Sequence, residues 1–137
     1  MIDEEEYVRI VDRYYSFILI EFYFVKSEKM AIGNSFFKVE FTNSKFTIYI
    51  SYENVESYLR IIVFELINGA MPSYDDSTHT LHLSRLNTLV MSKVNKDEVR
   101  VNAQFFSAQN PKTDIERKLL KGAKELRLCL KHLPELQ

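Results

Sequence analysis

The sequence is poor in the residues that build crosslinks, flexible linkers and phosphate-binding loops. Its 137 residues include one cysteine, three glycines, three prolines and no tryptophan. A lone cysteine, Cys129, cannot form an intramolecular disulfide, and the acidic start of the chain lacks the features of a secretory signal. We therefore expect a cytoplasmic protein. Three glycines also leave little room for a phosphate loop, and the chain has no Walker A, GxGxxG, HExxH or GxSxG motif.

Long apolar runs and a strong charge of one sign are missing as well. Stretches such as Phe22–Val25 and Ile61–Phe64 fall far short of the roughly 20 apolar residues that a membrane helix requires. The formal net charge is −1 and the sequence pI is about 6.3. A nucleic-acid-binding domain is expected to have a clustered basic surface and a high pI. We predict neither a membrane nor a nucleic acid as partner.

The residues that are abundant indicate a globular domain with an aromatic core. Hydrophobic residues make up 46% of the chain and charged residues 27%, while ten phenylalanines and eight tyrosines dominate the aromatic residues. This length and composition suit one domain with a single core, so we predict one α+β domain over residues 1–137.

Amphipathic helices are predicted at both ends of the chain. Asp3 and Glu6 have the spacing of a capping box, and apolar residues then recur every three or four positions, which predicts a helix over Asp3–Ile20. Thr113 and Glu116 form a second capping box before a longer apolar stripe. We expect that closing helix to end at Pro134, because proline disrupts helix interiors.

Alternating apolar and polar residues predict a sheet between the two helices. The period-two pattern of Phe37–Thr42 and Lys45–Tyr52, joined by a turn at Asn43–Ser44, is typical of a hairpin. Shorter patterns in the sequence on either side of this hairpin indicate further elements. They predict strands at Phe22–Ser27, Tyr58–Ile67 and Thr80–Leu83, a loop over Asn68–His79, and a helix capped by Ser84 that runs from Arg85 to about Lys93. The fold class is therefore α+β, with an antiparallel sheet of about four strands flanked by the terminal helices; residues 96–108 fit helix, strand or loop.

No pattern of residues predicts catalysis, a cofactor or a metal. His79 and His82 lie near Asp75 and Asp76, but two histidines three residues apart in a strand face opposite sides. Cys129 adjoins the apolar stripe of the closing helix and is expected to be a partly buried hydrophobic residue. We predict that the protein is not an enzyme and holds no cofactor.

Tyrosines and carboxylates gather around one turn and one loop. Tyrosine is favoured in protein interfaces because its ring buries area while its hydroxyl forms hydrogen bonds, and nearby carboxylates set the charge of the surface. The alternative is that several of these tyrosines complete the core. The predicted partner-binding residues are Tyr49, Tyr52, Glu53, Glu56, Tyr74, Asp75 and Asp76.

In its general architecture the chain resembles the small cytoplasmic immunity proteins that bacteria encode beside polymorphic or contact-dependent toxins. The similarity lies in the helix Asp3–Ile20, the aromatic hairpin Phe36–Tyr52, the loop at Tyr74–Asp76 and the capped helix from Thr113. The resemblance implies tight binding to one cognate toxin, with its active site or its assembly blocked and no cofactor involved.

Together these observations predict a stoichiometric protein-binding inhibitor whose partner is a cognate protein toxin. The alternative is a small-molecule-binding protein or enzyme with a pocket between the sheet and the N-terminal helix, lined by Tyr23, Phe37, Phe41 and Phe46. The sequence makes no prediction about the oligomeric state or the activity of the toxin.

Overall fold

The protein is built on a five-stranded antiparallel sheet whose strands lie in chain order. A computed structural model describes residues 1–136, with side chains described for residues 1–133. The strands are β1 (Val25–Ile32), β2 (Phe36–Thr42), β3 (Phe46–Glu53), β4 (Tyr58–Glu65) and β5 (Thr80–His82). The helices are α1 (Glu4–Tyr14), α2 (Phe17–Ile20), α3 (Leu83–Met91), α4 (Lys96–Phe105) and α5 (Asp114–Leu136). The predicted α+β class is confirmed, with one strand more than expected.

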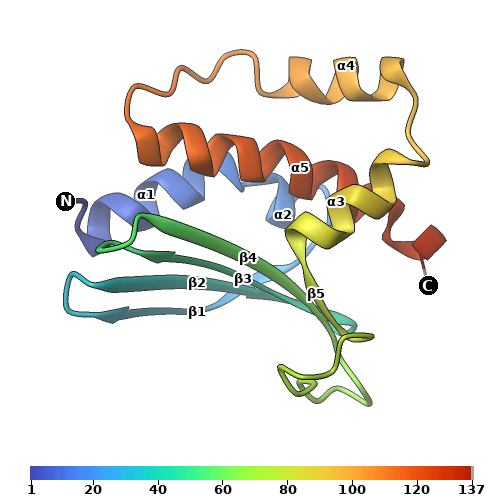
Figure 1. The fold of residues 1–137 in the computed structure, drawn as a ribbon, viewed down its shortest axis with the longest axis horizontal. Coiled ribbons are helices and arrows are strands. Elements are labelled where there is room, and N and C mark those ends of the chain that lie inside the picture. Colours follow the sequence, from blue (N-terminus) through green and yellow to red (C-terminus); the bar gives the residue numbers. More distant parts are fainter. Residues whose placement is uncertain (137) are drawn as a thin grey trace.

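The helices lie on one side of the sheet. Figure 1 shows α1, α2 and α5 against one face and α4 on the outer side of α5, while the opposite face has no helix over it. The core lies between the sheet and the inner helices, where the buried side chains of α1 and α5 meet those of β2, β3 and β4. We call the opposite surface the helix-free face.

The central hairpin forms as the alternation predicts. Phe37, Val39 and Phe41 of β2 are buried in the core, and they pair with β3 in a register that puts Phe41 opposite Ile48. The carboxamide of Asn43 accepts hydrogen bonds from the backbone N–H groups of Lys45 (2.8 Å) and Phe46 (2.7 Å). This Asx turn reverses the chain between the two strands.

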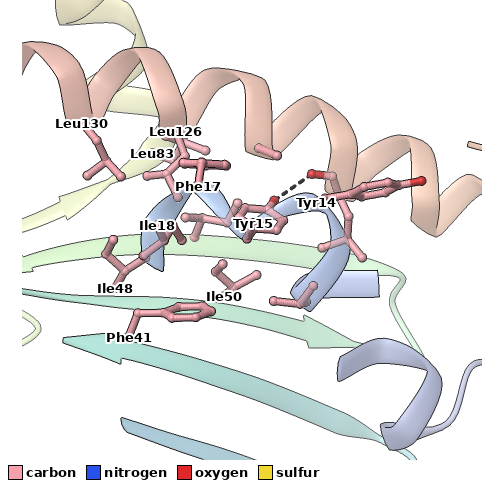
Figure 2. Close-up of a cluster of buried hydrophobic side chains, with 14 of the residues drawn as sticks. Tyr14, Tyr15, Phe17, Ile18, Phe41, Ile48, Ile50, Leu83, Leu126 and Leu130 are labelled. Carbon is pink, nitrogen blue, oxygen red and sulfur yellow. Dashed lines mark hydrogen bonds between the residues drawn. The ribbon is translucent and has the colours of Figure 1, made fainter. Parts of the chain in front are cut away.

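The opening helix is interrupted, contrary to the single helix predicted over residues 3–20. Asp3 caps α1 as expected, with its Oδ1 accepting from the Glu6 N–H at 2.8 Å, but α1 ends at Tyr14 and α2 begins at Phe17. The four large residues on either side of the break are all buried. Figure 2 shows these four side chains in the core, namely Tyr14, Tyr15, Phe17 and Ile18.

The first strand begins later than predicted and extends further. The predicted strand Phe22–Ser27 is replaced by β1 at Val25–Ile32, because Tyr23 has a φ of 60° and the Phe24 N–H still donates to the carbonyl of Ile18. β1 is a mostly exposed edge strand with no buried apolar alternation. The sequence therefore lacks the periodic signal that marks a half-buried strand.

In the second half of the chain, two helix boundaries differ from prediction, and the segment that fitted helix, strand or loop is a helix. Helix α3 begins at Leu83 with His82 at its N-cap, so Ser84 is inside the helix. The ambiguous segment is helix α4, where Asn95 caps the first turn by accepting from the Glu98 N–H at 2.8 Å. Helix α5 starts at the predicted capping box but continues past Pro134 to Leu136, since near a helix end a proline removes only one hydrogen bond of the final turns.

Helix α5 approaches the sheet most closely at Gly122. A Cβ atom there would lie 2.7 Å from Ile61 Cδ1 and 2.8 Å from the Tyr15 hydroxyl. That hydroxyl is held in place because it donates to the carbonyl of Leu119 at 2.7 Å, the bond drawn in Figure 2. A larger residue at this position would therefore force the side chain of Ile61 or Tyr15 to shift.

We predict that Gly122→Ala destabilises the protein although alanine is the better helix former. Overpacking lowers the free energy of unfolding by about 1–3 kcal/mol. The higher helix propensity of alanine raises it by up to about 1 kcal/mol. The Tyr15 hydroxyl cannot move without losing its hydrogen bond, so we expect a net fall in the free energy of unfolding, measured by chemical denaturation.

A double-mutant cycle isolates the cause. In a Tyr15→Phe background the hydroxyl is gone, and we expect Gly122→Ala to cost less there than in the parent protein. Lys131→Ala, at an exposed position on the same helix, serves as the control and should change stability little. Equal costs of Gly122→Ala in both backgrounds would contradict the steric explanation.

Candidate protein-binding surface

The helix-free face carries the alternate residues of β1 to β4. Strand pairing puts Tyr49 opposite Glu40 on one neighbouring strand and opposite Ile62 on the other, so these side chains share one face. Large apolar and aromatic side chains are exposed on it, including Tyr58 at 52% and Ile32 at 61%. Charged residues of both signs lie between them. The remaining members of the face include Glu28, Met30, Phe36, Lys38, Ser51, Arg60 and Phe64.

Three aromatic rings form a cluster at one end of this face. Tyr49 meets Phe64 edge to face with ring centroids 4.7 Å apart, and Tyr74 from the loop after β4 meets Phe64 at 5.7 Å. Phe64 is fully buried beneath this cover, whereas Tyr74 is 65% exposed. Tyr74 therefore presents an aromatic ring to solvent while its own position is fixed by packing.

Tyr49 lies in a charged environment on the helix-free face. The Lys38 ammonium is 4.1 Å from the centroid of the Tyr49 ring, a cation–π contact. Burial, followed by the carboxylate of Glu40, raises the pKa of the Tyr49 hydroxyl to about 12. A tyrosine hydroxyl is already neutral at physiological pH at its ordinary pKa of about 10, so the shift only extends its neutral range to higher pH.

The loop that carries Tyr74 is ordered by its own polar contacts. The Asp76 carboxylate accepts from the backbone N–H groups of Thr78 and His79, both at 3.1 Å, and lies 2.7 Å from His79 Nδ1. Partial desolvation acts to raise the pKa of Asp76, but the hydrogen bonds from His79 and Thr78 outweigh it and the pKa is lowered. Glu65 of β4 lies 3.7 Å from the other ring nitrogen of His79, which links the loop to the sheet.

The seven predicted residues do not form one continuous patch. Tyr49 and Tyr74 share the aromatic cluster with Phe64, and Asp75 and Asp76 follow in the same loop. Glu53 pairs with Tyr58 at the far end of β3 and β4, and Glu56 lies in the turn between these strands. Phe64 lies six positions after Tyr58 along β4, a distance of about 20 Å in an extended strand.

Tyr52 does not belong to the surface. Its side chain is only 5% exposed and points into the core, where its ring lies 6.1 Å from that of Tyr7. The alternation of the strand decides this, because Tyr52 has the same parity as Ile48 and Ile50. Here the alternative that some tyrosines complete the core is correct.

The pocket expected between the sheet and the N-terminal helix lacks its predicted lining. Phe37, Phe41 and Phe46 are buried in the core, whereas Tyr23 is 81% exposed on the segment between α2 and β1. The four side chains therefore do not surround a common space. Two hollows in the surface lie elsewhere, beside β4 and between α3, α4 and α5.

Sequence reasoning missed the residues that complete the face. Arg60 lies over the ring of Tyr58, with 5.4 Å between its guanidinium carbon and the ring centroid, and Lys38 lies over Tyr49. The signal was present in the pattern, because Lys38 and Arg60 occupy the polar positions of their strands. The β2–β3 register is needed to show that Lys38 is a neighbour of Tyr49, whereas Arg60 follows Tyr58 by two positions on the same strand.

Other reactive groups have structural surroundings. Cys129 is fully buried, and burial together with the nearby Glu125 raises the pKa of its thiol to about 12. No group of three or more His, Cys, Asp or Glu side chains in the described part of the chain is arranged to hold a metal ion. None of the helices described here is both long and apolar enough to cross a membrane.

Comparison of the chain with protein-family models, with curated proteins and with solved structures finds no match. The resemblance to immunity proteins therefore stays a prediction from architecture.

The electrostatics of the face lead to a prediction for Tyr49. We expect its hydroxyl to titrate with a pKa of about 12, and Glu40→Gln to shift that pKa down toward the ordinary value of about 10. The measurement is an NMR titration of the tyrosine Cζ resonances. Glu53→Gln, at the end of the same strand, is the control and should leave the Tyr49 resonance unchanged.

The same shift has a consequence for stability. A folded-state pKa above the unfolded value means that the neutral tyrosine stabilises the fold fully below about pH 10. This contribution is lost as the pH rises toward about 12. Glu40→Gln should reduce that alkaline loss, and an unaltered loss would show that Tyr49 does not cause it.

Proposed function

We propose that the protein is a stoichiometric protein-binding inhibitor that engages its partner through the helix-free face of the sheet. The observation that carries this proposal is the composition of that face. It combines exposed aromatic side chains with charged residues of both signs, whereas the other face of the same sheet is covered by helices. Fixed aromatic side chains beside charged groups favour the recognition of a protein surface.

The proposed partner is a cognate protein toxin, which the inhibitor would neutralise by one-to-one binding without a cofactor. This follows the architectural resemblance to immunity proteins. The ordered aromatic cluster supports it, since side chains already fixed before binding lose little conformational freedom in a complex. Tyr74 fits such a role because its ring is exposed but rests on the buried Phe64.

A capture experiment identifies the partner and tests the inhibition. The tagged protein is used to isolate binding proteins from the lysate and secreted fraction of its source organism, and the recovered partner is then purified. Isothermal titration should give a one-to-one complex, and the partner's toxicity should fall to zero at one equivalent. A partner whose activity is unchanged in the complex would contradict the inhibitor function.

Point variants test the face itself. We expect Tyr74→Ala to weaken partner binding by about tenfold or more, because an aromatic hot-spot residue of an interface contributes about 2 kcal/mol or more. Asp75→Lys tests the charge beside it and is preferable to a change at Asp76, whose carboxylate orders the loop. The control is Tyr23→Ala, which removes an exposed tyrosine outside the face. Equal affinities for Tyr74→Ala and the control would exclude the aromatic cluster from the interface.

A further inference from the structure

The outer edge of β4 is only partly covered by its neighbouring strand. β5 pairs with Ile62–Phe64 alone, and the chain then turns into α3 at Leu83. The first half of β4, Tyr58–Ile61, therefore has no strand beside it on that side within the described structure. Figure 1 shows this half of β4 at the edge of the sheet, with α5 passing above it.

A groove of about 410 Å³ follows this uncovered edge. One wall is the start of β4, the other is α5, and the junction of β5 with α3 closes one end. The close approach of α5 at Gly122 forms part of its lining. A further set of residues completes the lining, namely Ser57–Ile61, His82–Ser84, Lys118, Lys121 and Glu125.

The backbone of β4 turns hydrogen-bonding groups toward this groove. Leu66 donates its N–H to Lys45 on the β3 side, whereas Glu65 donates to His79 on the β5 side. Main-chain groups alternate between the two sides of a strand, so those of the odd-numbered residues Leu59 and Ile61 are directed away from β3. An extended polypeptide laid along the groove would meet them as the next strand of the sheet.

The charges of the groove favour an acidic occupant. Three basic side chains line it, while Glu125 is its single carboxylate, and burial raises the pKa of that carboxyl. Lys118 already donates to the Ser57 carbonyl at 2.8 Å and pairs with Asp114 at 3.2 Å. Arg60 and Lys121 are then the cations best placed to meet a ligand.

We propose that this groove binds an extended acidic segment of the partner protein, which adds a strand to the open edge of β4. The inference deepens the proposed function, on which it rests in taking a protein as ligand. Main-chain hydrogen bonds to Leu59 would fix the segment in the sheet, and acidic side chains would contact Arg60 and Lys121. Tyr58 and Arg60 also belong to the helix-free face, so the groove and that face adjoin along β4.

The test does not require the partner. The full-length protein is used to select binders from a displayed library of random linear peptides, and an enriched peptide is synthesised. We expect enriched sequences to be acidic, and the amide of Leu59 to gain hydrogen-exchange protection when the peptide binds. Lys121→Glu should weaken the affinity for the peptide by at least about tenfold. The matched Lys131→Glu, at an exposed position on the same helix, should have little effect on that affinity.

Each other outcome overturns the inference. These are a selection that enriches no peptide, peptides without acidic character, affinity unchanged in a folded Lys121→Glu variant, or protection confined to residues away from β4. A dimer of this chain through the β4 edge, detected by sedimentation, would identify a second copy as occupant instead. If acidic peptides bind as expected but no protein is inhibited, peptide binding in the groove is supported and the inhibitor function is rejected. If a toxin is inhibited but the peptide test fails, only the proposal of peptide binding in the groove is rejected.

Discussion

The contact between α5 and the sheet at Gly122 is the constraint on which the rest of the structure depends. A helix can approach a sheet this closely only where a side chain is missing, and here the vacant space is filled by Ile61 and by the hydroxyl of Tyr15. The Tyr15 hydroxyl in turn binds the α5 backbone at Leu119. Because Tyr15 lies at the break between α1 and α2, one point of packing fixes the opening helices, the closing helix and β4 together.

The outer layer of the protein is attached to α5 by polar contacts. Arg127 of α5 is only 7% exposed and binds the Glu21 carboxylate through Nε at 2.9 Å and Nη2 at 3.1 Å. It also donates to Asn102 of α4 at 2.8 Å and lies over the ring of Phe105. The net contribution of such a buried ion pair to stability is limited, because desolvation offsets much of the attraction. Its consequence here is that α4, which buries little of its own surface, has a defined position on α5.

The sequence predicted elements with strong local signals and missed those set by distant contacts. The β2–β3 hairpin and the capping box at Thr113 follow from alternation and side-chain caps, which act within a few residues. Tyr15, at the break after Tyr14, is held by a hydrogen bond to α5 more than 100 residues away, and β1 is an edge strand with almost no buried side chains. The candidate surface shows the same limit. Parity along β3 separates Tyr49 from Tyr52, but joining Tyr49 to Tyr74 needs the path of a loop that carries no periodic signal.

One-sided packing explains why the two proposed binding surfaces lie next to each other. The helices cover one face of the sheet, so apolar residues of the other face stay exposed unless a loop covers them, as Tyr74 covers Phe64. The chain leaves β5 after three residues to begin α3, and this early turn leaves the first half of β4 without a neighbour. Tyr58 and Arg60 belong to both the helix-free face and the open edge, since one strand supplies side chains to the face and main-chain groups to the edge. A partner that added a strand to β4 would therefore lie beside the exposed rings, and each contact would hold it in place for the other.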